Sequence, residues 1–179
     1  MINKLSILLQ QPQKIFHTAD LRILWDIYNQ NTLRQTLSRY TKKNNLFRIY
    51  KGVYSTIDPQ KLNTIELGYR LFNRHCYLTT ETVLSQNGLI NHSPTKITFV
   101  SSLSQNIILN QHTFLSRQLK SQYLHNTVGI SQLPNGVLVA SPARAVADLL
   151  YFQPNFHFDA GSIINWDQVK QIQQEVYLL

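Results

Sequence analysis

The segment 31–54, NTLRQTLSRYTKKNNLFRIYKGVY, constrains the fold of this chain more than any other. Leu33, Leu37 and Tyr40 recur at helical spacing, which predicts an amphipathic helix with a polar face opposite these three residues. The segment carries six basic side chains and no acidic one: Arg34, Arg39, Lys42, Lys43, Arg48 and Lys51. Because the segment cannot neutralise its own charge, we expect a polyanion to do so.

The charge excess of the whole chain lies in its first part. Residues 1–75 hold twelve lysines and arginines against four acidic residues, whereas residues 76–179 hold five of each class. A basic part joined to a neutral part indicates a polyanion-binding module fused to a module with another role. The alternative is a basic surface that binds nothing and only keeps the protein in solution.

Length and composition set the class of protein. A chain of 179 residues with 43% apolar residues is long enough for one large or two small folded domains. Cys76 is the single cysteine, so no internal disulfide can form, and the apolar run near the amino terminus is too short for a signal peptide. The longest uncharged stretch, residues 97–116, contains polar side chains that a bilayer would not accommodate unpaired. We therefore expect a cytoplasmic protein that does not enter a membrane.

The pattern predicts an α+β protein with two domains. Residues 1–57 show the order helix, helix, helix, hairpin, which is typical of a winged helix-turn-helix DNA-binding domain. Its expected elements are a helix over 4–10, a helix over 19–26 capped by Thr18, the basic helix from Asn31 or Thr32 to 44–45, and strands over 46–49 and 53–56.

Residues 58–179 predict an α+β domain with a mainly antiparallel sheet, reached through a linking helix over 61–73. The expected strands cover 76–78, 97–100, 107–109, 113–117, 128–131 and 137–140. The expected helices follow caps at Thr79 or Thr80, at Ser141 before Pro142, and at Asn165.

The residue types that carry catalysis are dispersed. No pair among the nine carboxylates has a spacing typical of shared acid–base or two-metal chemistry, and the six histidines show no metal-ligand pattern. His75 and Cys76 are adjacent on an expected strand, so their side chains point to opposite faces and cannot act as base and nucleophile. We therefore expect no catalytic residue, no metal and no cofactor. An enzyme such as a nuclease or nucleotidyltransferase, with carboxylates gathered by folding, remains the alternative.

The basic helix has the side chains that a helix in the DNA major groove needs, namely polar or long cationic groups for base edges and cations for phosphates. The candidate base-reading residues are Arg34, Gln35, Ser38 and Arg39, and the candidate phosphate contacts are Lys42, Lys43, Arg48 and Lys51. Thr32 is a further candidate DNA-binding residue. Two alternatives remain: a solvated charged face that binds nothing, and a module that binds an acidic protein without sequence-specific DNA binding.

Four aromatic residues of the first part would either stack on single-stranded bases or form part of the core: Trp25, Phe47, Tyr50 and Tyr54.

Two groups of residues stand out in the second part. Arg144 and Asp148, four residues apart on an expected helix, predict a surface ion pair or a contact with a partner protein. Five aromatic residues around Pro154 predict a loop clamped onto the core or an interaction patch: Tyr151, Phe152, Phe156, Phe158 and Trp166.

Several runs of sequence resemble AbiEi-type antitoxins, the antitoxin half of type IV toxin–antitoxin systems. FHTADL at 16–21 and LFRIYKGVY at 46–54 resemble the start of that family. YLTTETVL at 77–84, followed by Gly88, and SPARAVADLL at 141–150 resemble its later motifs, with Ala143 where an acidic residue is common. The similarity extends over residues 15–159.

The resemblance implies a winged-helix protein that binds inverted repeats in operator DNA and represses its own operon. It also implies that the protein counters a nucleotidyltransferase-type toxin without being an enzyme itself. The oligomeric state that fits is a monomer or a dimer assembled on DNA.

Overall fold

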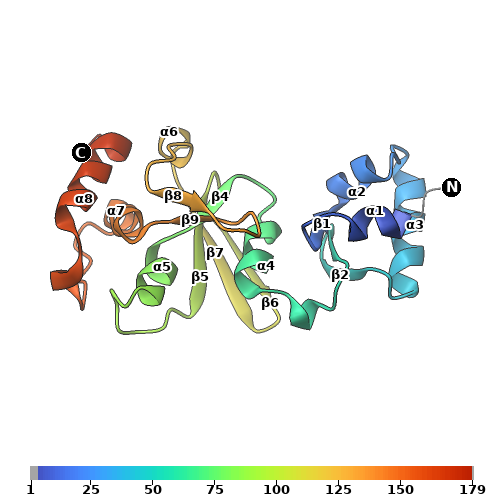
Figure 1. Cartoon of the computed structure of the whole chain (residues 1–179), viewed down its shortest axis with the longest axis horizontal. Helices are drawn as coiled ribbons and strands as arrows, with labels where there is room; N and C mark the ends of the chain where they lie inside the picture. The colour runs from blue at the N-terminus through green and yellow to red at the C-terminus, as the bar shows by residue number, and fades with distance from the viewer. Residues whose placement is uncertain (1–3, 179) are drawn as a thin grey trace. The chain divides into compact units, whose positions relative to one another are not determined.

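The computed structural model describes residues 4–178 and divides the chain into two compact units, Met1–Asn73 and Arg74–Leu179 (Figure 1). The expected domain boundary lay after residue 57. The observed boundary, between Asn73 and Arg74, lies later in the chain because the helix α4 (Thr64–Leu71) packs on the strand β1 (Ile15–His17) of the first unit. His17 Nε2 lies 2.6 Å from the carbonyl oxygen of Arg70, which joins the two elements directly. The expected linking helix is therefore part of the first unit.

The first unit contains four α-helices and a three-stranded antiparallel sheet with the order β1-β3-β2 among its described residues. The elements that follow β1 are α2 (Thr18–Leu24), α3 (Gln30–Lys42), β2 (Phe47–Tyr50), β3 (Val53–Ser55) and the short 3-10 helix η1 (Pro59–Lys61), and α1 (Lys4–Leu9) precedes it. The strand β1 was not expected from the sequence. It has only three residues, too few to display an alternating pattern, and its position depends on pairing with β3.

An apolar core holds the helices of the first unit together: Leu8, Phe16, Leu21, Trp25, Ile27, Leu33, Leu37 and Leu46. The indole of Trp25 donates a hydrogen bond to the Lys4 carbonyl at 2.9 Å and packs against the ring of Tyr40. Trp25 is thus a core residue, whereas Tyr50 is exposed and Phe47 and Tyr54 are half-buried.

The start of α2 corrects one expectation. The N-cap is His17 and not Thr18, and the Asp20 carboxylate accepts the His17 backbone N–H at 2.8 Å. Thr18 instead fixes the turn between β2 and β3, because its N–H and its hydroxyl both donate to the Gly52 carbonyl, at 2.9 and 3.2 Å. Gly52 has a φ of +76°, a conformation that glycine adopts without strain.

The second unit is a six-stranded sheet with helices (Figure 1). Its strands are β4 (Cys76–Leu78), β5 (Lys96–Ser101), β6 (Gln105–Leu109), β7 (His112–Gln118), β8 (Ile130–Gln132) and β9 (Leu138–Ala140). Its helices are α5 (Thr80–Gln86), α6 (Ser121–Leu124), α7 (Pro142–Phe152), η2 (Gly161–Ile163) and α8 (Trp166–Ile172), continued by the π-helical turn η3 (Gln173–Tyr177). The caps at Thr79, Ser141 and Asn165 agree with the sequence.

The sheet of the second unit is mixed, which corrects the expectation of a mainly antiparallel sheet. The strand order is β6-β7-β5-β4-β9-β8, in which β5–β7 and β4–β9 are parallel pairs and the other three pairs are antiparallel. The hairpin of β6 and β7 places its second strand beside β5, so the chain must cross over. Local alternation identifies strands but does not specify their neighbours, so the sequence could not predict this order.

Helices α5 and α7 pack on each other, α5 also contacts β5, and α8 packs against α7. No helix among residues 4–178 is long and apolar enough to span a membrane.

Candidate nucleic-acid interface

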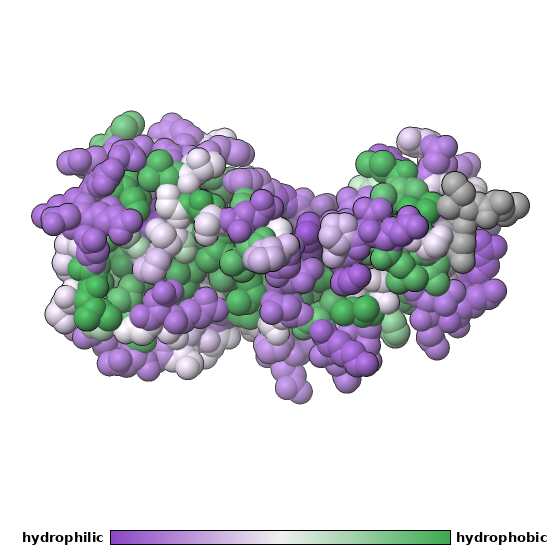
Figure 2. Space-filling view, viewed as in Figure 1, coloured by the Kyte–Doolittle hydropathy of each residue, from purple (hydrophilic) through white to green (hydrophobic). Residues whose placement is uncertain are grey.

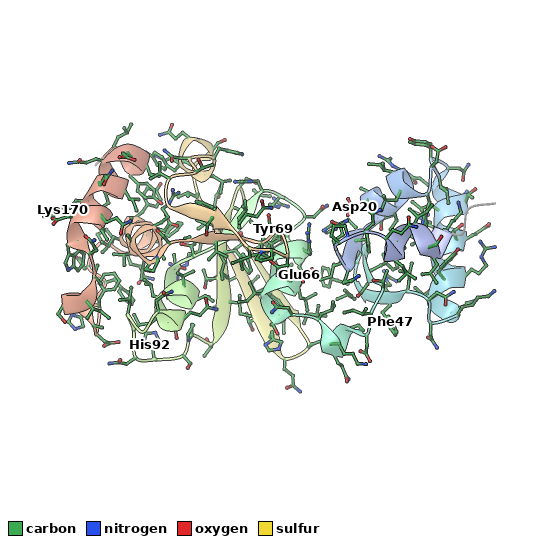
Figure 3. All side chains as sticks on the ribbon, in the orientation of Figure 1. Asp20, Phe47, Glu66, Tyr69, His92 and Lys170 are labelled. Carbon is green, nitrogen blue, oxygen red and sulfur yellow. The ribbon has the colours of Figure 1, made fainter. Side chains whose placement is uncertain are left out.

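The helix α3 presents one apolar and one cationic face. Leu33, Thr36 and Leu37 are buried, and the half-buried Tyr40 packs beside them, as the spacing predicted. The polar residues expected on the opposite face are all exposed: Arg34, Gln35, Ser38, Arg39 and Lys42. Together with the exposed Lys43 they line one shallow depression of the surface. Figure 3 shows long side chains extending from α3 on the side away from the core of its unit. In Figure 2 the visible surface over the lower part of α3 is hydrophilic.

The two ends of α3 are fixed by asparagines. The N-cap is Asn29, and not Asn31 or Thr32 as expected, because Asn29 Oδ1 accepts the N–H and the hydroxyl of Thr32 at 3.0 and 3.3 Å. Thr32 is exposed, but its hydroxyl proton is committed to the cap, so only its oxygen is free to accept. The helix ends at Lys42, two residues before the expected end, and Asn44 follows in the left-handed conformation with a φ of 55°.

The hairpin of β2 and β3 carries the other two predicted contacts. Arg48 lies on β2 opposite Tyr54, and Lys51 occupies the turn; both are exposed. The bonds from Thr18 to the Gly52 carbonyl tie this turn to the first residue of α2. Hairpin and helices are therefore held in one compact unit, as a joint binding surface requires.

No acidic side chain pairs with this cationic set within the described part of the chain. Both ion pairs found among residues 4–178 lie in the second unit. Two carboxylates of the first unit have backbone partners: Asp20 accepts the N–H of His17, and Asp58 accepts the N–H of Gln60 at 2.9 Å. The cations of α3 and the hairpin therefore have no ion-pair partner in the described part of the chain.

Arg22 is a candidate contact that the sequence reasoning missed. It is exposed on α2 and lines a depression between α2 and α3 together with Arg34, Thr18 and Gln30. The signal was available in the sequence, because Arg22 lies one helical turn after the first residue of α2. An arginine on the first helix of such a pair is suited to a phosphate contact.

His17, the last residue of β1, has an imidazole with a lowered pKa. Burial lowers the pKa of its imidazole, while its hydrogen bond to the Arg70 carbonyl and the charge of Asp20 act in the opposite direction. His17 lies where β1, α2 and α4 meet, so its protonation bears on the integrity of this unit.

Arg144 and Asp148 correct the expectation of a surface ion pair. Both side chains are completely buried, with Arg144 Nε 2.7 Å from Asp148 Oδ1. The remaining guanidinium nitrogens donate to the Val128 carbonyl at 2.8 Å and to the Tyr77 hydroxyl at 2.7 Å, and more weakly to the carbonyls of Asn126 and Tyr123. A side chain without exposure cannot meet a partner protein in this conformation, so the pair is part of the interior of the second unit.

The Asp148 carboxylate also has hydrogen-bond partners for its oxygens. It accepts hydrogen bonds from Arg144, from the Thr79 hydroxyl at 2.6 Å and from the Tyr177 hydroxyl. Burial raises the pKa of Tyr77 and of Tyr177, and the charge of Asp148 acts in the same direction. Burial disfavours the charged form of Arg144, but the charge and hydrogen bond of Asp148, together with Tyr77 and Tyr177, outweigh it and raise the pKa of Arg144. The network links β4, α7 and the last turn of the chain.

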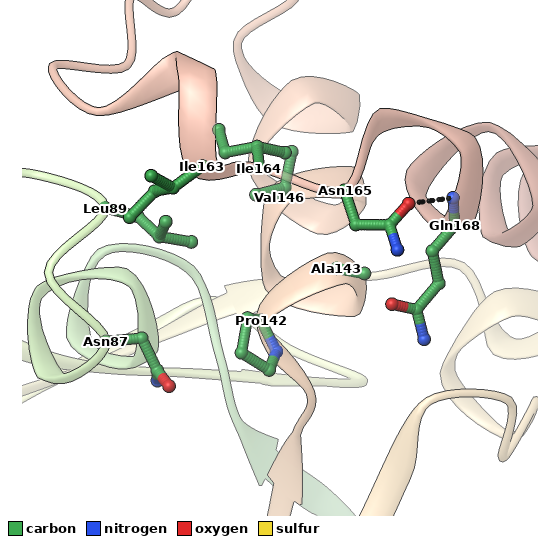
Figure 4. A pocket seen from close by; sticks show the side chains of 9 residues that line it. All are labelled: Asn87, Leu89, Pro142, Ala143, Val146, Ile163, Ile164, Asn165 and Gln168. Atoms are coloured by element: carbon green, nitrogen blue, oxygen red, sulfur yellow. Dashed lines mark hydrogen bonds between the residues drawn. The ribbon is translucent and has the colours of Figure 1, made fainter.

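A cavity of about 260 Å³ lies in the second unit, between α5, α7 and α8 (Figure 4). Its walls are apolar, apart from the side-chain amides of Asn87, Asn165 and Gln168. Asn165 Oδ1 accepts the backbone N–H of Gln168 at 3.1 Å as the cap of α8. Without a charged residue in its lining, this cavity has no group suited to a polyanion.

The aromatic residues near Pro154 divide into two contacting groups. Tyr151 stacks on Tyr177 at a ring distance of 4.8 Å, and Phe158 meets Phe156 and Trp166 at 5.0 and 5.8 Å. Phe158 is buried and Trp166 is 40% exposed. The contacts of Phe158 with Phe156 and Trp166 thus pack the segment after α7 against the start of α8.

The described residues contain no cluster of three or more histidine, cysteine or acidic side chains that could hold a metal ion. Cys76 is buried, and His75 is exposed and stacks on His125 at 5.0 Å.

No family model matches this sequence, and no curated protein is similar to it. Among solved structures, the crystal structure of the RV2827C protein from Mycobacterium tuberculosis is similar, with a TM-score of 0.57 and 12% sequence identity. The match covers 95% of this chain and 69% of that one. At this level of identity the likeness shows a shared fold, which by itself assigns no activity.

Proposed function

We propose that the first unit contains a winged helix-turn-helix that binds double-stranded operator DNA, with α3 in the major groove and the β2–β3 hairpin as the wing. The order helix, strand, helix, helix, hairpin supports this assignment, because α2 and α3 then stand where the two helices of the motif belong. The observation that carries the proposal is the cationic face of α3, which has no ion-pair partner in the described part of the chain.

The proposal gives the exposed residues two roles. Four residues of α3 offer hydrogen-bonding groups to base edges: Arg34, Gln35, Ser38 and Arg39. Arginine pairs well with guanine and glutamine with adenine. Lys42, Lys43, Arg48 and Lys51 neutralise phosphates and set the position of the domain on the duplex.

Fluorescence anisotropy with the DNA upstream of the gene, at several salt concentrations, tests this proposal. Affinity should fall steeply with salt, because each phosphate contact releases counterions. Lys42→Ala should weaken binding to all duplexes alike, whereas Gln35→Ala should reduce the preference for the operator over unrelated DNA. Lys170→Ala, which removes an exposed lysine from the second unit, is the matched control and should bind as the unmodified protein does.

Binding that is insensitive to salt would contradict the proposal. Co-purification of an acidic protein, without affinity for any duplex, would favour the protein-interaction module instead.

We further propose that the chain is the antitoxin and autoregulator of a type IV toxin–antitoxin system. The support for this role is the resemblance of residues 15–159 to AbiEi-type antitoxins, and it assigns the counteraction of a nucleotidyltransferase-type toxin to the second unit. Co-expression with the product of a neighbouring toxin gene should restore growth. Growth arrest that persists beside folded, expressed protein would contradict the antitoxin role and leave DNA binding unaffected.

A further inference from the structure

The strand β6 forms one edge of the six-stranded sheet, and β7 is its one neighbour among the described strands (Figure 1). It has five residues, Gln105–Leu109, with no proline and no charge. The whole stretch 97–116 lacks lysine, arginine, aspartate and glutamate. Exposed edges are normally protected from pairing by charge, proline or shortness. The edge at β6 has none of these protections.

The opposite edge of the same sheet differs. The strand β8 has only three residues, Ile130–Gln132, and Pro134 follows it closely. A short strand ending near a proline offers little for another strand to pair with. The contrast singles out β6 as the edge that is open to pairing.

The register shows which backbone groups of β6 face outward. Asn110 and Gln111 both have positive φ angles and form a two-residue turn, so Leu109 and His112 close the hairpin as a hydrogen-bonded pair. Such pairs alternate with non-hydrogen-bonded pairs along an antiparallel ladder. The N–H and C=O groups of Asn106 and Ile108 therefore point away from β7. Ile108 is also 72% exposed, and Leu103, just before the strand, is 50% exposed.

We propose that two copies of this chain associate through β6, antiparallel and about a two-fold axis at Ile107, to form one continuous sheet. Asn106 of each copy then lies opposite Ile108 of the other, and their outward N–H and C=O groups bond reciprocally. The exposed Ile108 side chains gain cross-strand neighbours on the same face.

Charge argues for a second copy as the occupant. An uncharged edge meets its own copy without repulsion, whereas it offers no counter-charge to a strongly charged partner strand. The inference goes beyond DNA binding and does not depend on it, although a two-fold dimer would match an operator made of inverted repeats.

Sedimentation velocity on the full chain without DNA, from about 1 to about 100 µM, tests the inference, since that range brackets a micromolar dimer. The unmodified protein should shift from monomer to dimer as its concentration rises. Ile108→Lys places like charges near the two-fold axis and should weaken the dimer by about tenfold or more. Ile163→Lys changes an isoleucine of similar exposure, 66%, outside the sheet, and should dimerise as the unmodified protein does.

Hydrogen exchange gives an independent readout, because the amides of Asn106 and Ile108 should become protected only at dimer-forming concentrations. A monomer throughout the range would overturn the inference, as would an Ile108→Lys variant that dimerises normally. A β6 edge that pairs only with a strand from a different protein would also overturn it. None of these results depends on whether the first unit binds DNA, so the two proposals fail separately.

Discussion

Arg144 and Asp148 lie one turn apart on α7, joined by a 2.7 Å hydrogen bond, with both side chains inaccessible to solvent. The guanidinium also reaches three backbone carbonyls and Tyr77, and the carboxylate reaches Thr79 and Tyr177. A buried pair with all its hydrogen bonds made is tolerated at little net cost, whereas either charge left alone is costly.

Asp148→Ala should therefore strongly destabilise the second unit. It leaves the Arg144 charge buried and unpaired, and we expect a loss of about 3–5 kcal/mol in the free energy of unfolding, measured by urea denaturation. Asp167→Ala, at an exposed aspartate of α8, is the matched control and should cost less than about 1 kcal/mol. A similar small loss for both variants would mean that the buried pair is not coupled to the stability of the unit.

Alkaline pH should destabilise the second unit. The pKa of Tyr77 and of Tyr177 is raised, so from about pH 10 upward the unfolded chain releases protons that the folded chain retains. The unfolded state then binds fewer protons, and the free energy of unfolding falls as pH rises. Tyr177→Phe should make this decline shallower and should cost about 1–2 kcal/mol at neutral pH through the lost hydrogen bond. Tyr28→Phe, at a tyrosine that is 67% exposed, should leave the alkaline slope unchanged.

Mild acid should destabilise the first unit through His17. Its pKa is lowered on folding, so the unfolded state binds more protons between that lowered pKa and the ordinary value of 6.5. The stabilisation is complete above about pH 6.5 and is lost as pH falls below it. His17→Gln keeps a hydrogen-bond donor and should flatten this dependence.

The measurement for His17 is thermal unfolding followed by Trp25 fluorescence. A Trp166→Phe background makes Trp25 the single indole, and Trp25 is buried in the core of the first unit. An equal melting temperature on both sides of pH 6.5 would contradict the role of His17.

Arg22→Ala should weaken operator binding. If Arg22 neutralises a phosphate beside α3, its removal lowers affinity for every duplex alike and reduces the slope of log affinity against log salt by about one unit. Fluorescence anisotropy measures both quantities, with Lys170→Ala as the unaffected control. A change in operator preference without a change in salt slope would instead place Arg22 against a base edge.

Some of this structure could be predicted from local sequence. The spacing of Leu33, Leu37 and Tyr40 gave the inward face of α3, and the caps at Ser141 and Asn165 gave the starts of α7 and α8. Each depends on residues within about one helical turn, where spacing and capping chemistry are decisive.

The burial of Arg144 and Asp148 depends on more distant residues. Their spacing is the same in an exposed ion pair, so the pair alone could not reveal its position. The composition of α7 was the usable signal. All seven residues from Ala143 to Leu149 are buried, and a helix that is packed on every side leaves its charged residues no solvent face. The strand order of the second unit likewise depends on contacts between distant segments.

The two hydrogen bonds from Thr18 to the Gly52 carbonyl hold the turn of the β2–β3 hairpin at the start of α2. The tip of the hairpin is attached to α2, so its separation from α3 cannot be adjusted without breaking those bonds. Under the proposed DNA binding, a target with a spacer of altered length would have to be accommodated by deformation of the DNA. We therefore predict that insertions between the stretches proposed to contact α3 and Lys51 are tolerated best at flexible base steps, as measured by fluorescence anisotropy.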